Sequence, residues 1–145
     1  MITYELNQSP LRGGQRLPRA RVAHTMTACA RALKLKRPAQ VSIAFVSPRR
    51  MRALNRAWRG KDAVTDVLSF SLDEGTIKGE IVLCYEQAAR QAAQIGHSVR
   101  DELLLLIVHG VLHLWGYDHE RQADTKKMFT LQERVLRSLK SNPHL

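Results

Sequence analysis

Three histidines lie within eleven residues of one another: His109, His113 and His119, in the pattern H-x3-H-x5-H. Residues i and i+4 of an α-helix share one face, so His109 and His113 can direct both imidazoles at one ion. Gly116 stands where a helix can end through a left-handed residue and return His119 towards the first two. A catalytic zinc ion is typically held by three protein ligands such as neutral imidazoles, and its fourth coordination position is open to water. We therefore expect one Zn²⁺ held by these three histidines.

The chain around the first two histidines is strongly apolar. Residues 103–115 have the sequence LLLLIVHGVLHLW, which predicts a helix buried in the core. Imidazoles buried there would cost stability unless something satisfies their polar atoms, and a metal ion does so. A closed structural site would take a fourth protein ligand, typically cysteine, but Cys29 and Cys84 are both distant in sequence.

The residue after the first histidine indicates which reaction such a centre would catalyse. The pattern resembles the H-E-x-x-H-x-x-G-x-x-H motif of metzincin peptidases, except that Gly110 replaces the glutamate. Peptide hydrolysis uses that carboxylate to move a proton from water to the leaving amine. Phosphate oxygens are themselves basic, so phosphodiester cleavage depends less on such a group. The sequence favours a metal-dependent hydrolase of a substrate other than peptides.

Charge is the second informative property. The chain has 23 Lys and Arg against 13 Asp and Glu, a net charge of +10, and residues 1–61 hold 14 of these cations but one acid, Glu5. Such asymmetry favours a polyanionic partner such as RNA or DNA, although many small basic proteins carry charge only for solubility. Arg49, Arg52 and Arg56 recur at helical spacing, so they form either a track for a phosphate backbone or an ordinary solvated face.

The remaining sequence predicts a single α+β domain over residues 1–145. Its 145 residues are 44% hydrophobic and 25% charged, which excludes disordered and low-complexity classes. Residues 1–10 do not resemble a signal peptide, the run 103–108 is too short for a membrane span, and both cysteines are expected as buried cytoplasmic thiols. Predicted strands are 2–7, 41–46, 66–72 and 78–84. The first predicted helix begins near Pro18. Further helices are predicted over residues 48–57, 85–95, 99–115 and 120–140, and residues 58–65 are predicted to be a loop.

Three segments resemble one known family. Residues 109–119, HGVLHLWGYDH, are similar to the H-G-x-L-H-L-x-G-Y-D-H signature of the YbeY endoribonucleases. Residues 54–70 resemble the L-N-x-x-x-R-x-K-D-x-P-T-D-V-L-S-F block of that family, and residues 79–83 resemble its G-D-I strand. The chain departs from these patterns at three positions that leave the histidines untouched, Val64, Ser71 and Glu80.

The resemblance implies a small mixed sheet packed with about five helices, one of them a zincin-like helix that carries metal ligands. It also implies a zinc-dependent endoribonuclease acting on single-stranded ribosomal RNA, in maturation of the small-subunit RNA 3′ end and in ribosome quality control. Ribosomes or small-subunit assembly factors would be partners. Arg59 matches the family's arginine, and a planar guanidinium suits a scissile phosphate. Lys61 could add charge, and Asp62 could orient either cation.

Several roles stay open at this stage. Asp118 could support a histidine or a metal-bound water, or cap the following helix, and we favour a structural or supporting role. Tyr117, Trp115 and Trp58 are expected to pack, although an exposed Trp58 beside Arg59 could stack on a base. A non-catalytic, zinc-containing ribosome-assembly protein is the main alternative function. A metallopeptidase is a weaker one.

Overall fold

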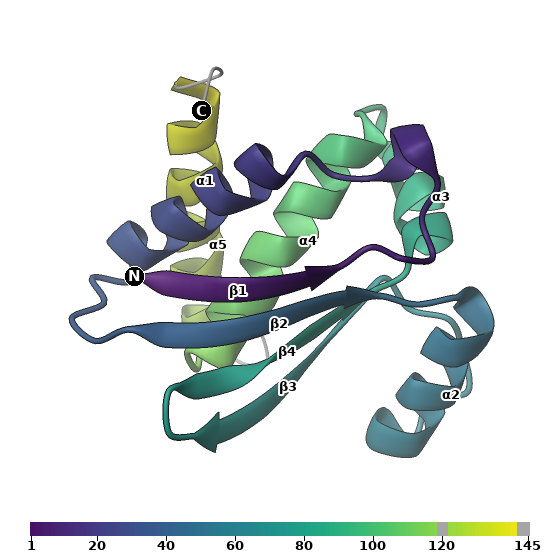
Figure 1. Cartoon of the computed structure of the whole chain (residues 1–145), viewed down its shortest axis with the longest axis horizontal. Coiled ribbons are helices and arrows are strands. Elements are labelled where there is room, and N and C mark those ends of the chain that lie inside the picture. The colour runs from purple at the N-terminus through teal and green to yellow at the C-terminus, as the bar shows by residue number, and fades with distance from the viewer. Residues whose placement is uncertain (119–121, 142–145) are drawn as a thin grey trace.

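The computed structural model describes residues 1–118 and 122–141 of the chain. These residues form a four-stranded sheet, five α-helices and a short 3-10 helix, which confirms the predicted α+β class (Figure 1). In chain order the elements are β1 (Ile2–Asn7), η1 (Gly13–Gln15), α1 (Arg19–Ala32), β2 (Ala39–Phe45), α2 (Pro48–Arg59), β3 (Val67–Glu74), β4 (Ile77–Leu83), α3 (Tyr85–Ile95), α4 (Val99–Leu114) and α5 (Gln122–Ser141).

The strands lie in the order β1-β2-β4-β3. Strand β1 pairs with β2, and β2 with β4, in parallel, whereas β3 and β4 form an antiparallel hairpin. The hairpin turns at Gly75, whose positive φ of 62° suits a residue without a Cβ. Strand β3 is therefore an edge strand, paired on one side only within the described part of the chain.

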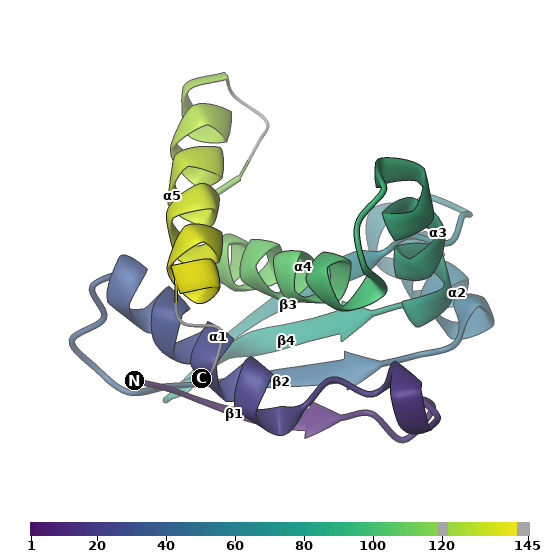
Figure 2. The ribbon, with the colours of Figure 1, turned by 90° about the horizontal axis from the view of Figure 1, so that it is seen from above.

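One face of the sheet carries the main core. Ile43 of β2 with Ile81 and Leu83 of β4 are fully buried there, in one cluster with residues of α1 and α4. Helix α5 packs against both α1 and α4, and it crosses one end of the histidine-bearing helix, which also lies on the sheet (Figure 2). Helix α4 is apolar on nearly all sides, as its sequence predicts.

The opposite face of the sheet carries a smaller cluster. Leu68 of β3 and Val82 of β4 alternate with the residues of the main core and pack with Met51 of α2. Helix α2 thus lies across the sheet from α4. Cys84 is buried in this cluster and Cys29 in the main core, and both are free thiols, as expected.

Most predicted elements are confirmed, and one boundary is wrong in a way that matters for the site. Trp58 and Arg59 belong to the last turn of α2 and not to a loop, because Gly60 ends the helix in the left-handed conformation, with φ 69°. A short 3-10 helix, η1, also lies between β1 and α1. No helix among the described residues combines the length and apolar character needed to cross a membrane.

Candidate metal centre

His109 and His113 meet on one face of α4. Their Nε2 atoms lie 3.1 Å apart, and their ring planes are inclined by 75°. Two Zn–N bonds of about 2.0–2.1 Å at a tetrahedral angle hold their nitrogens about 3.3–3.4 Å apart. The pair therefore already has nearly the separation of two ligands on one zinc ion, and imidazole nitrogens are donors that zinc takes.

Gln132 of α5 fixes the protonation pattern of the first histidine. Its Oε1 lies 3.1 Å from Nδ1 of His109, and the residue is only 7% exposed. An amide oxygen only accepts hydrogen bonds, so Nδ1 carries the proton and, in the neutral ring, Nε2 presents its lone pair to the partner histidine. Such an outer hydrogen bond is typical of histidines that bind metal.

Sequence reasoning missed Gln132, although a signal was present. The residue follows Met128 by four positions and precedes Val135 by three, so it lies on the apolar side of an amphipathic helix. A polar side chain at a position predicted to be buried needs a partner. Only the packing of α5 on α4 identifies that partner as His109.

His119, the predicted third ligand, lies outside the described residues. Gly116 just before it adopts the expected left-handed conformation, with φ 92°, and so ends α4. Across residues 1–118 and 122–141, no three histidine, cysteine or acidic side chains gather as a metal site would require. The role of His119 therefore stays a prediction, as does that of Asp118. Tyr117 packs partly buried against the main core, as expected.

Gly110 has a packing reason to be glycine. A Cβ at this position would lie 3.0–3.2 Å from the side chain of Ile81 on β4, so α4 rests on the sheet at this point. The residue that would be glutamate in the peptidase pattern therefore faces the sheet. A side chain there would be forced against β4, which adds a steric argument to the chemical argument against a peptidase.

The hairpin holds the end of α4 closely. Ser69 Oγ of β3 donates a hydrogen bond to the Gly110 carbonyl at 3.3 Å. At Gly79 of β4, a Cβ would lie 2.4 Å from the backbone oxygen of Phe70 and 2.5 Å from a methyl of Leu114. Glycine at this position is thus what lets the C-terminal turn of α4 approach the sheet.

Arg59 ends α2 with its side chain exposed, and it has no ion-pair partner among the described residues. The expectation that Asp62 orients Arg59 or Lys61 is wrong. Asp62 instead accepts two hydrogen bonds from Arg52, at 2.8 and 3.1 Å, which lower the pKa of its carboxyl group. An i+10 pair of this kind fastens the α2–β3 loop back onto α2 and leaves Arg59 available to an external anion.

Asn55 restrains the same loop from inside. It is buried on α2, and its Nδ2 donates to the Ala63 carbonyl at 2.9 Å. Together with the Arg52–Asp62 pair, this bond gives the segment after Arg59 a defined path. The loop that follows Arg59 is therefore held in place by contacts within the chain.

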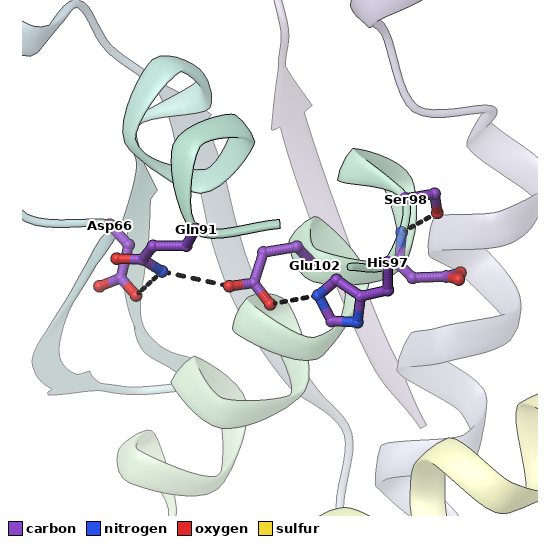
Figure 3. A network of polar contacts seen from close by, with 6 residues as sticks. Asp66, Gln91, His97, Ser98 and Glu102 are labelled. Atoms are coloured by element: carbon purple, nitrogen blue, oxygen red, sulfur yellow. Dashed lines mark hydrogen bonds and ion pairs between the residues drawn. The ribbon is translucent and has the colours of Figure 1, made fainter. Parts of the chain in front are cut away.

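A partly buried polar chain, which the sequence did not reveal, links the end of this loop to α4 (Figure 3). Asp66 Oδ2 accepts a hydrogen bond from Gln91 Nε2 at 2.9 Å, and the same nitrogen lies 3.1 Å from Glu102 Oε2. The other oxygen of Glu102 lies 3.0 Å from His97 Nε2. Glu102 is 3% exposed. The chain joins the residue before β3 to α3 and α4, and so fixes the loop relative to the histidine helix.

Comparison with known proteins identifies the family. Residues 8–140 match the family described as Endoribonuclease YbeY. The chain belongs to the YbeY family.

Individual YbeY relatives support this assignment. A protein named Endoribonuclease YbeY from Anaeromyxobacter sp. (strain Fw109-5) is 45% identical over 131 residues, which cover 88% of this chain and 66% of that protein. The namesake from Salinispora tropica is 45% identical over 119 residues, covering 71% of this chain and 76% of the relative. The chain thus spans about two thirds to three quarters of these relatives' lengths.

A solved structure agrees with the fold. The solution structure of a Thermotoga maritima protein is 30% identical in sequence and has a TM-score of 0.62, covering 99% of this chain and 94% of its own. The family match over residues 8–140 also confirms the resemblance to YbeY that three sequence motifs indicate. The chain is a member of a family of endoribonucleases.

Proposed function

We propose that this protein is a zinc-dependent endoribonuclease that hydrolyses phosphodiester bonds in single-stranded RNA. One observation carries the proposal: His109 and His113 present paired Nε2 atoms 3.1 Å apart, with the outer nitrogen of His109 fixed by Gln132. In a YbeY family member, this pair with His119 would hold one zinc ion.

The residues of the chain divide the work between the ion and the substrate. A zinc ion, when bound, supplies Lewis acidity that polarises a phosphoryl oxygen and lowers the pKa of water. His109 and His113 would hold it, with Gln132 keeping the first imidazole in its ligating tautomer. Arg59, unpaired among the described residues, would bind two phosphate oxygens and offset the negative charge that grows in the transition state.

The basic half of the chain would draw the substrate in. Helix α2 carries five arginines and no acid, and it ends at Arg59. A polyanion is attracted along such a helix, and the attraction should fall steeply with salt concentration. This surface supports RNA over a peptide as the substrate.

We also place the reaction in ribosomal RNA maturation, at the 3′ end of the small-subunit RNA, and in ribosome quality control. This assignment rests on the resemblance of residues 54–70, 79–83 and 109–119 to the family's blocks. The partners would be ribosomal RNA and factors of small-subunit assembly.

The test is zinc content and RNA cleavage measured on the same purified samples. His113→Ala is expected to lose both the metal and cleavage. Arg59→Ala is expected to retain the metal and lose cleavage, with Arg134→Ala on α5 as an exposed-arginine control. If Arg59→Ala cleaves like the wild type, its assigned role is wrong. If zinc-loaded wild type does not cleave RNA, and metal removal only unfolds it, the protein is a zinc-stabilised assembly factor.

A further inference from the structure

Trp58 contradicts the expectation that it is a packing residue. Its side chain, in the last turn of α2, is 70% exposed. An indole so exposed forgoes most of the hydrophobic gain of burial, since a buried aromatic side chain removes about 150–250 Å² from water. The other tryptophan, Trp115, is by contrast partly buried against the main core and has Lys78 over its ring.

The Trp58 ring is nevertheless held in a defined orientation. Phe70 of β3 meets it edge-on, with ring centroids 5.6 Å apart and planes inclined by 66°. Phe70 itself packs on the smaller core cluster, so it provides a fixed support. A T-shaped contact covers at most one broad face of the indole, so at least one face is left without that neighbour for stacking on a flat ligand.

The charge of helix α2 selects the ligand class. Trp58 directly precedes Arg59, and α2 contributes Arg49, Arg50 and Arg56 besides the paired Arg52. Of these five arginines, only Arg52 is in an ion pair within residues 1–118 and 122–141. An exposed aromatic side chain on the same helix as four arginines without an ion pair in the described structure is the combination that binds unpaired bases and their phosphates.

The edge strand connects this ring to the metal centre. Neighbouring residues of β3 point to opposite faces, so Phe70 supports Trp58 on the α2 side while Ser69 bonds to Gly110 on the α4 side. Gly110 lies between the two histidines in sequence. Strand β3 has an unpaired edge within the described chain. An extended RNA strand that crosses this edge would therefore reach the Trp58 face of the hairpin and the α4 face as well.

We propose that Trp58 is a stacking platform for one unpaired base of the RNA, next to the nucleotide whose phosphate Arg59 binds. This inference rests on the proposed ribonuclease function and extends it. It explains selection of single-stranded substrate, because a base within a duplex is already stacked and cannot cover the indole.

The experiment combines kinetics with a direct optical signal. Trp58→Ala is expected to raise KM for a short oligouridylate about 10- to 100-fold, with a much smaller change in kcat. Trp58→Phe is expected to recover most of the loss. Ile95→Ala on α3, where the side chain is 66% exposed, is the matched control and should behave as wild type.

The optical measurement uses Trp115→Phe, in which Trp58 is the sole tryptophan. Stopped-flow mixing with oligouridylate should quench its fluorescence before cleavage proceeds, whereas an abasic oligonucleotide of equal length should not. Three results would overturn the stacking role while wild-type cleavage stands: quenching by the abasic strand equal to that by oligouridylate, duplex RNA that competes with oligouridylate for binding as well as single-stranded RNA does, or an unchanged KM in Trp58→Ala. Absence of RNA cleavage by the zinc-loaded wild type would instead remove the proposed function, and this inference with it.

Discussion

Replacing Gln132 with leucine removes the oxygen that accepts the Nδ1 proton of His109, while nearly preserving the buried volume. The hydrogen bond measures 3.1 Å and its acceptor is 7% exposed, so water does not readily replace it. Without an acceptor the ring is free to change tautomer or rotate, and Nε2 loses its fixed lone pair. Loss of such an outer partner costs about 10- to 100-fold in metal affinity, or roughly 1.4–2.7 kcal/mol.

A competition titration against a zinc-binding dye measures this change. Gln132→Glu keeps an acceptor oxygen and should retain wild-type affinity or exceed it, because a carboxylate accepts the same proton more strongly. Gln94→Leu, the same substitution at an exposed position of α3, controls for general effects. Wild-type zinc affinity in Gln132→Leu would refute the argument that α5 sets the state of His109.

Three further outcomes are expected. Gly79→Ala should lower the unfolding free energy in urea by about 1–3 kcal/mol, because the new Cβ would lie 2.4 Å from the Phe70 oxygen; unchanged stability would contradict the close approach. Burial raises the pKa of Cys29 to about 12, so iodoacetamide at pH 8 should label it only after unfolding, and its stabilising contribution should be lost as pH rises from about 9 towards 12. Hydrogen bonds from Arg52 lower the pKa of Asp62, so the pair contributes to folding stability above the ordinary carboxyl pKa of 3.8 and loses this contribution as pH falls through the lowered pKa. In Arg52→Ala, the pKa of Asp62 measured by NMR titration should return towards 3.8.

Local patterns were sufficient for most of the fold. Ser98 accepts a capping hydrogen bond from the Asp101 backbone, and Gly96, Gly116 and the apolar periodicity locate the helix ends and faces. These signals act over a few residues, so they survive in the sequence alone. The wrong boundary at Trp58 has the same origin. The predicted helix ends before Trp58 because the residues from there onward lack apolar periodicity, whereas in the structure α2 continues to Arg59 and ends at Gly60.

The candidate site divides in the same way. The spacing of His109 and His113 on one helix determined that their imidazoles meet, because a helix turn places i and i+4 side by side. Nothing local could assign Gln132, which lies 23 residues from His109, or the chain from Asp66 to Glu102 and His97. Such partners depend on which helices pack together.

The sequence by itself determined the histidine pair, the excess of positive charge in residues 1–61 and the class of fold, because these follow from helical spacing, composition and short-range periodicity. Only the tertiary structure decided that Gly110 faces Ile81, that Asp62 pairs with Arg52, and that Trp58 stands exposed beside Phe70. Each of these depends on contacts between elements, and side-chain burial is a property of the packed whole and not of any segment.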